Sequence, residues 1–210
     1  MIPNNLPAPT ALNGLVLAGG KSSRMGIPKD TMNWHGKEQR YRVADLLAAL
    51  CHDVYISCRP DQKEDIDPAY GALPDIFPDM GPLGGILSAF NVQKDVAWLV
   101  VASDMPLLDE KALDSLVRSR NPASIATTYE SPVDGLPEPL VTIWEPGSYP
   151  LLLDFVHSGP ASPRKFLMQH RISILKPEYP DTLVNVNTPE EADQIREMLR
   201  RGNTDGMQDI

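Results

Sequence analysis

A chain of 210 residues is long enough for one ordinary α/β domain with a substantial core. Its 42% apolar and 22% charged residues are typical of a globular protein. The formal net charge of −9 argues against duplex nucleic acid or an anionic membrane surface as the main partner, because both favour a basic surface. A small anionic ligand is compatible with this charge, since local clusters of Lys and Arg can attract anions.

Short apolar runs rich in β-formers alternate with stretches of helical spacing along the chain. Strands are predicted over residues 12–18, 53–58, 96–103, 124–129, 140–144, 172–176 and 182–186. Helices are predicted over residues 38–50, 84–92, 109–119, 147–157, 163–170 and 189–200. Several of the strands are continuous apolar runs, which indicates burial on both faces. The alternation therefore predicts an α/β fold of three layers with a mostly parallel central sheet.

The two ends of the chain differ from the rest. Residues 1–10 are rich in proline and residues 201–210 are polar, so both are expected to be loose, which leaves 11–200 as a single domain. The N-terminus lacks the regions of a signal peptide, and no apolar run approaches membrane-spanning length. Cys51 and Cys58 fit no common zinc spacing and are expected to be core or near-core thiols. These features lead us to expect a cytoplasmic protein.

The first predicted strand leads directly into the loop LAGGKSSRMGIPKD, residues 17–30. Gly19 and Gly20 allow close backbone approach to a ligand, and successive backbone N–H groups can bind an anion there. Three basic residues could supply charge along a phosphate chain. They are Lys21, Arg24 and Lys29. The spacing matches neither the Rossmann fingerprint nor the P-loop, so the loop taken alone fits an anion site and a solvated turn equally well.

An acidic residue, Asp104, follows the apolar run 96–103 at the edge where open α/β sheets bind ligands. A helix-capping role is less favoured, because Asp109 stands directly before the next helix and Pro106 keeps Asp104 outside it. A carboxylate facing a basic, glycine-rich loop suits Mg²⁺, which binds one or two carboxylates together with waters and substrate phosphates. The sequence therefore predicts Asp104 as a metal ligand.

Two glycine- or amide-containing segments are placed for the same sheet edge. GPLGG, residues 81–85, leads into an apolar helix and by itself fits an ordinary connection. In NVNTPEEA, the residues from Thr188 to Glu191 form a capping box. That pattern leaves Asn185 and Asn187 at a strand end, free to face a ligand.

Charged residues mark two further segments of the chain. Arg164 and Lys165 lie in the first turn of a predicted helix, where basic residues oppose the helix dipole unless an anion binds. Residues 130–140, ESPVDGLPEPL, form an acidic, proline-rich stretch that is predicted to be a loop. The histidines show no metal-ligand spacing, and nothing supports a Ser/His/Asp relay.

Taken together and in order, LVLAGGKSSRMGIPKD, GPLGG, SDMP and NVNTPEE resemble the molybdenum cofactor guanylyltransferase (MobA) family of nucleotidyltransferases, over about residues 12–199. The first motif is typical of the wider superfamily, while GPLGG and NVNTPEE favour the molybdopterin branch. The resemblance implies a Rossmann-like nucleotidyltransferase fold. It also implies transfer of GMP from GTP to the terminal phosphate of molybdenum-molybdopterin with release of pyrophosphate, Mg²⁺ as cofactor, and transient contacts with other cofactor-synthesis proteins.

The resemblance further implies roles for individual residues. Those expected to bind the nucleotide are Leu17, Ala18, Gly19, Gly20, Lys29, Asp75 and Asp104. Those expected to act in catalysis are Arg24, Lys29 and Asp104, with Asp104 as the metal ligand. Asn185 and Asn187 would line the acceptor side, and Arg164 and Lys165 are added there as anion-binding residues.

Two departures from the family pattern bear on the site. Asp30 directly follows Lys29 and would weaken phosphate binding if it pointed inward. The segment GLPEPLVTIW stands where the family more often has an apolar residue or Pro-Thr, so the acceptor pocket is expected to differ in detail. The alternatives are a molybdopterin cytidylyltransferase, a sugar-phosphate nucleotidyltransferase, and a non-catalytic nucleotide-binding protein. The joint presence of Arg24, Lys29 and Asp104 favours an enzyme.

Overall fold

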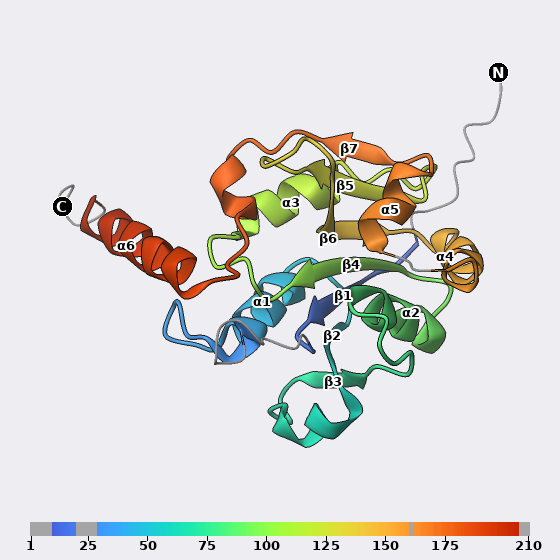
Figure 1. Ribbon diagram of the computed structural model, residues 1–210, viewed down its shortest axis with the longest axis horizontal. Helices are drawn as coiled ribbons and strands as arrows, with labels where there is room; N and C mark the ends of the chain where they lie inside the picture. Colours follow the sequence, from blue (N-terminus) through green and yellow to red (C-terminus); the bar gives the residue numbers. More distant parts are fainter. Residues whose placement is uncertain (1–9, 20–28, 160–161, 206–210) are drawn as a thin grey trace.

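The computed structural model describes residues 10–19, 29–159 and 162–205 (Figure 1). Seven strands form one sheet in the order β3-β2-β1-β4-β6-β5-β7. The strands are β1 Leu12–Leu17, β2 Val54–Cys58, β3 Gly71–Pro74, β4 Ala97–Ala102, β5 Ala126–Glu130, β6 Pro137–Trp144 and β7 Ser173–Leu175. The α-helices are α1 Gln39–Ala48, α2 Pro82–Val92, α3 Glu110–Arg118, α4 Ser148–His157, α5 Pro163–Met168 and α6 Pro189–Asp205. Short 3₁₀ helices span Lys29–Thr31, Pro60–Asp65 and Pro180–Leu183.

Strand direction confirms the mostly parallel sheet. β6 is antiparallel to both of its neighbours, β4 and β5, and the other four pairings described are parallel. The chain builds β1, β2 and β3 outward in one direction and then returns to place β4 beside β1. The order of strands therefore reverses between β1 and β4, which is where open α/β sheets form a ligand crevice.

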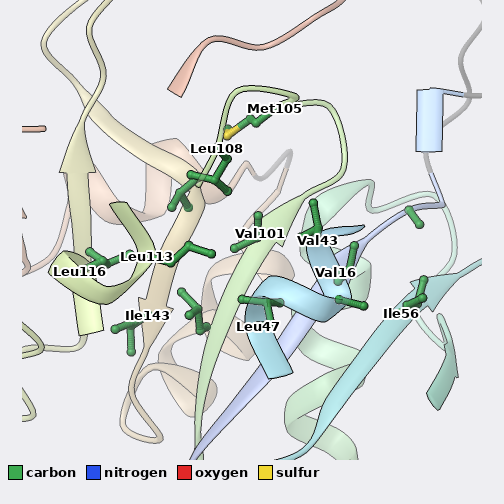
Figure 2. Close-up of a cluster of buried hydrophobic side chains, with 14 of the residues drawn as sticks. Val16, Val43, Leu47, Ile56, Val101, Met105, Leu108, Leu113, Leu116 and Ile143 are labelled. Atoms are coloured by element: carbon green, nitrogen blue, oxygen red, sulfur yellow. The ribbon is translucent and has the colours of Figure 1, made fainter. Parts of the chain in front are cut away.

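Helices cover both faces of this sheet, which gives the predicted three layers (Figure 1). α1 and α3 pack on one face, where Leu47 and Leu113 belong to the same buried cluster as Val16 and Val101 (Figure 2). α2, α4 and α5 pack on the other face, in a cluster that includes Leu15. Successive residues of a strand point to opposite faces, so strands covered on both sides need apolar residues throughout. This requirement explains the continuous apolar runs.

Most of the predicted elements are confirmed within a few residues, but the expected strand at 182–186 is wrong. Pro180 begins a 3₁₀ helix that ends at Leu183. The chain then continues through Val184 to Asn187 outside the regular elements, although Leu183 and Val186 are buried. An apolar β-branched run resembles a strand in sequence, but here Leu183 is buried in the cluster that α1 and α3 cover, and Val186 packs beside α6, without strand pairing.

Two further differences concern strands that the sequence pattern obscures. β3 was not predicted, because it is four residues long and contains a glycine and a proline. β6 begins at Pro137, inside the stretch predicted to be a loop. Its described pairing with β4 stops at Val141, so Pro137 and Pro139 lie where no ladder bond to β4 is required.

Other features of the chain follow from burial. Cys58 is buried and Cys51 half-buried, both as free thiols, as predicted. Burial raises the pKa of Cys51 to about 12 and that of Cys58 to about 11. α6 runs to Asp205, beyond the expected domain end at residue 200. In the described part of the chain, no helix is both long and apolar enough to cross a membrane.

Candidate active site

The carboxyl ends of four parallel strands lie level at one edge of the sheet. Leu17, the last residue of β1, pairs with Ala102 at the end of β4 and with Ser57 near the end of β2. Cys58 of β2 pairs with Pro74 at the end of β3. The residues that follow these strand ends are therefore brought together, as expected for an open α/β sheet.

A cavity of about 570 Å³ opens at this edge, between the ends of β1 and β4. Its lining residues come from every loop that follows these strands. They are Leu17, Ala18, Gly19, Asp30, Ser57, Arg59, Pro60, Asp61, Asp75, Phe77, Pro78, Asp79, Gly81, Pro82, Ala102, Ser103, Asp104 and Leu140. A cleft of this size, with an apolar wall and a few convergent polar groups, suits a small-molecule ligand.

Five of the predicted nucleotide-binding residues line this cavity, namely Leu17, Ala18, Gly19, Asp75 and Asp104. At Gly19 an added Cβ would lie 3.3 Å from the backbone nitrogen of Arg59, so the glycine allows β1 and β2 to continue side by side past their ends. The remaining members of the motif lie outside the described residues, or have side chains outside them. These are Gly20, Lys21, Arg24 and the side chain of Lys29.

Asp75 is held at the cavity wall by a specific hydrogen bond. The hydroxyl of Ser57, on β2, donates to its carboxylate at 2.7 Å. Burial raises the pKa of Asp75, and the bond from Ser57 acts in the opposite direction. Behind this pair, Gly85 of α2 leaves room for the Ser57 hydroxyl, which an added Cβ would approach to 2.6 Å. The glycines of GPLGG thus allow α2 to pack closely against the Asp75 wall.

Asp104 stands in a tightly bonded turn directly after β4. The hydroxyl of Ser103 donates to the carbonyl of Leu17 at 3.0 Å, which ties the start of the turn to β1. The backbone carbonyl of Asp104 accepts from the N–H of Val186 at 2.8 Å, so Asn185 and Asn187 flank a residue bonded to this turn. The structure therefore brings the two asparagines to the Asp104 side of the site.

The donor set around Asp104 fits Mg²⁺. Asp104 supplies a carboxylate, and the buried side-chain oxygen Oδ1 of Asn185 has no hydrogen-bond partner among the described residues. Oxygen ligands of this kind are those that Mg²⁺ prefers, and it takes its other ligands from water and phosphates. Within the described ranges no group of three or more His, Cys, Asp or Glu side chains gathers at a metal-binding spacing.

Asp30, the residue that departs from the family pattern, does line the cavity. It is buried, and its carboxylate lies 3.5 Å from the guanidinium of Arg40, the second residue of α1. Burial raises the pKa of Asp30, while the charge of Arg40 acts to lower it. Arg40 also donates to the backbone carbonyl of Asp65 at 3.2 Å, so it connects the start of α1 to Asp30 and to the end of the 3₁₀ helix Pro60–Asp65.

A second groove, of about 350 Å³, lies between the start of β6, α5 and the start of α6. Its lining includes Arg164, Asn185 and Asn187, three of the four predicted acceptor-binding residues. Lys165 is exposed and is not among the residues that line it. From the sequence, an anion bound at the start of α5 was expected to offset the charges of Arg164 and Lys165. In the structure, two carboxylates of the protein itself offset the charge of Arg164.

Those carboxylates are Asp134 and Glu138, which Arg164 contacts at 2.8 Å and 3.3 Å. Glu138 is buried at the start of β6 and also accepts from the N–H of Leu140 at 3.2 Å. Burial raises its pKa, and the charge of Asp104 adds to this effect. The groove is therefore electrostatically linked to Asp104 through Glu138.

Three of these residues were missed in the sequence. Glu138 fell in a predicted loop, Arg40 occupied an ordinary position of a predicted helix, and Ser57 was a polar residue in a predicted strand. Only Ser57 carried a usable signal, because a serine near the end of a parallel strand lies at the ligand-binding edge.

Comparison with known proteins places this geometry among nucleotidyltransferases. Residues 14–174 match the MobA-like NTP transferase domain family. A molybdenum cofactor guanylyltransferase of Xanthomonas euvesicatoria pv. vesicatoria is 34% identical over 187 residues, which cover 85% of this chain and 90% of that protein.

A molybdenum cofactor biosynthesis bifunctional protein of Synechocystis sp. is 33% identical over 187 residues. The match covers 89% of this chain and 54% of that protein, so this chain spans about half of its length. Among solved structures, molybdopterin-guanine dinucleotide biosynthesis protein A from Archaeoglobus fulgidus superposes with a TM-score of 0.76 at 21% identity, covering 90% of this chain and 99% of that one. At this identity the superposition establishes the fold.

Proposed function

This chain belongs to the MobA-like NTP transferase domain family, and on that basis we propose that it transfers GMP from GTP to the terminal phosphate of molybdenum-molybdopterin. The relative from Xanthomonas, whose name states guanylyl transfer, supports this choice of substrates. The observation that carries the proposal is that Asp104 lines the cavity with Gly19 and Asp75, while its backbone carbonyl is bonded to Val186, between two asparagines that line the groove. A group transfer between two bound substrates needs such an arrangement.

We assign the larger cavity to the nucleotide and the groove to the acceptor. Gly19 lets the nucleotide approach the backbone, and Asp75 offers a carboxylate to hydrogen-bond donors of the base or ribose. Arg24 and Lys29 are assigned to the triphosphate. Asn185, Asn187 and Arg164 are assigned to the acceptor, and Lys165 to a peripheral position at most, because it does not line the groove.

In the proposed reaction, an oxygen of the acceptor phosphate attacks the α-phosphorus of GTP. A new P–O bond forms, the bond to the oxygen bridging the α- and β-phosphates breaks, and pyrophosphate leaves with the electron pair. The acceptor phosphate is already ionised at neutral pH, so the reaction requires no histidine as general base.

Charge is the main obstacle to this reaction, because two anions must meet. Mg²⁺ held by Asp104 and the Oδ1 atom of Asn185 would offset the charge on the attacking and leaving oxygens. Arg24 and Lys29 would add positive charge along the triphosphate. Arg40 neutralises Asp30 at the cavity wall, which limits the repulsion that Asp30 would otherwise exert on a phosphate.

The proposal is tested by measuring pyrophosphate release from each of GTP, CTP, ATP and UTP with no acceptor, with molybdopterin loaded with molybdenum, and with a sugar phosphate. Release that requires both GTP and the acceptor is the expected result. Release with CTP alone would identify a cytidylyltransferase, and release with a sugar phosphate as the acceptor a sugar-phosphate enzyme. No release under any condition would contradict an enzymatic function and favour a nucleotide-binding protein.

A further inference from the structure

Three consecutive backbone carbonyls in the turn after β4 accept hydrogen bonds from three separate donors. The carbonyl of Asp104 accepts from the N–H of Val186 at 2.8 Å. The carbonyl of Met105 accepts from the side-chain amide of Gln39 at 3.0 Å. The carbonyl of Pro106 lies 2.9 Å from Nε2 of His35 and, since a carbonyl only accepts, this nitrogen donates. The turn is thus held by two side chains from one segment, residues 33–39.

That segment is built to reach the turn. Asn33 and Glu38 form an isolated antiparallel bridge, and the N–H of Gln39 donates to the carbonyl of Met32 at 2.9 Å. Gly36 closes the reversal with a φ of 81°, which glycine adopts without strain. The reversal leaves His35 at its tip and Gln39 at its base, both within hydrogen-bond distance of the Asp104 turn.

The buried position of the Gln39 side chain lowers the stability of the fold. Its side chain is fully buried, and Oε1 has no hydrogen-bond partner among the described residues. A buried amide oxygen without a partner costs about 1–3 kcal/mol, so an apolar residue of the same size would suit a purely structural role better. The hydrogen bond from Gln39 to Met105 therefore points to a requirement of the turn rather than of the core.

We propose that Gln39 is a positioning residue for Asp104, with His35 as a weaker second support. By fixing the carbonyls of Met105 and Pro106, the segment 33–39 fixes the turn that presents the Asp104 carboxylate to the site. The metal ion is part of the proposed function, so the value of this support to catalysis rests on that function. The immobilisation of the turn itself does not.

The experiment compares Gln39→Met with wild type in two measurements. Mn²⁺ titration monitored by electron paramagnetic resonance, with a non-hydrolysable GTP analogue present, measures metal affinity. Hydrogen exchange followed by NMR measures the Val186 amide, whose partner is the Asp104 carbonyl. We expect Mn²⁺ affinity to fall about tenfold or more, the typical effect of removing an outer support of a metal ligand. The Val186 amide should also exchange faster, with the affinity for the nucleotide analogue in the absence of metal unchanged.

Ser148→Ala is the matched control, because Ser148 is also fully buried and donates to a backbone carbonyl, that of Glu145, at 2.7 Å. It lies beyond the end of β6, at the opposite edge of the sheet, and should leave Mn²⁺ affinity and Val186 exchange at wild-type values. His35→Phe replaces a side chain at the exposed tip of the reversal and therefore tests the same support if Gln39→Met does not fold. It should change both readouts in the same direction by a smaller factor.

Wild-type values of either readout in Gln39→Met would overturn the proposal, as would equal changes in Ser148→Ala. If Gln39→Met does not fold, wild-type values in His35→Phe would do so. Failure of the proposed function gives a different result. In that case wild type would transfer no nucleotidyl group, while Gln39→Met would still speed exchange of the Val186 amide.

Discussion

Asp30 and Arg40 form a buried ion pair in the wall of the larger cavity, with Arg40 Nη1 3.5 Å from Asp30 Oδ2. The side chains are 6% and 9% exposed, so water screens their charges little. Removing one partner of such a pair leaves an uncompensated charge in a poorly solvated position. This lowers the unfolding free energy far more than replacing both partners does. In the proposed function, the pair would let a chain that carries an acid directly after Lys29 accept the triphosphate of GTP.

The first prediction follows from this pair. In Arg40→Met, the unpaired Asp30 carboxylate faces the cavity, so we expect a higher KM for GTP and a loss of about 3 kcal/mol of unfolding free energy. The double variant Asp30→Asn with Arg40→Met should recover the KM and part of the stability, because the residue facing the cavity is then neutral, while Glu38, which Arg40 also contacts at 2.8 Å, still loses its partner. Steady-state kinetics and urea unfolding measure the two effects, and a double variant as impaired as the single one would contradict this account.

A second prediction concerns the carboxylate of Asp104. Asp104→Asn should lower kcat by about 10²–10³, the typical effect of losing one positioned charge in the transition state. Circular dichroism should show an unchanged fold, since the backbone bond to Val186 does not involve the side chain. Asp193→Asn, on the exposed surface of α6, serves as the control and should retain full activity. Near-normal pyrophosphate release by Asp104→Asn would remove Asp104 from the mechanism.

A third prediction uses two glycines in different surroundings. In Gly85→Ala the new Cβ would approach the Ser57 hydroxyl to 2.6 Å and Leu17 Cδ2 to 2.7 Å, both in the cavity wall. We expect this change to displace the Ser57–Asp75 pair and raise the KM for GTP. Gly147→Ala meets nothing within 4 Å and should leave the KM unchanged while stabilising the fold by about 0.4–1 kcal/mol. Equal KM values for the two variants would show that close packing at Gly85 does not matter.

A fourth prediction separates Arg164 from its neighbour in sequence. Arg164→Ala, combined with Glu138→Gln so that no buried carboxylate loses its partner, should raise the KM for the acceptor and leave that for GTP unchanged. Lys165→Ala should change neither, because Lys165 does not line the groove. The single variant Glu138→Gln is the control for the double one. An effect of Lys165→Ala equal to that of the double variant would place the acceptor elsewhere.

A fifth prediction follows from the raised pKa of Asp75. Burial raises this pKa above its usual value near 3.8, so the folded state disfavours the ionised carboxylate. Folding stability is then greatest below the unfolded pKa and declines as the pH rises through the folded pKa. Asp75→Asn should therefore gain stability relative to wild type between pH 4 and pH 7, as measured by urea unfolding across that range. It should also bind GTP more weakly. A stability difference between Asp75→Asn and wild type that does not change with pH would contradict a raised pKa of Asp75.

A residue's role could be predicted from the sequence where it depends on the element that the residue follows, and not where it depends on contacts with segments distant in sequence. Asp104 was predicted because an acid after an apolar strand has a fixed place in a parallel sheet, and the structure places it at the predicted edge. Gln39 and Arg40 gave no such signal, because each occupies an unremarkable helical position and acts on a turn or loop distant in sequence. Asn185 lines the groove although the strand predicted around it is absent, because Pro180–Leu183 forms a 3₁₀ helix and the chain after it is irregular.

The hydrogen bond between Val186 and Asp104 bears on the order in which the parts of the site can form while the chain is being translated. β1 to β4 come from the first half of the chain, so the wall carrying Gly19, Asp75 and Asp104 can assemble early on the ribosome. The segment that bonds the Asp104 carbonyl is translated only shortly before α6. A nascent chain would thus form the larger cavity well before the groove, and the two would meet only when the segment before α6 docks on the Asp104 turn.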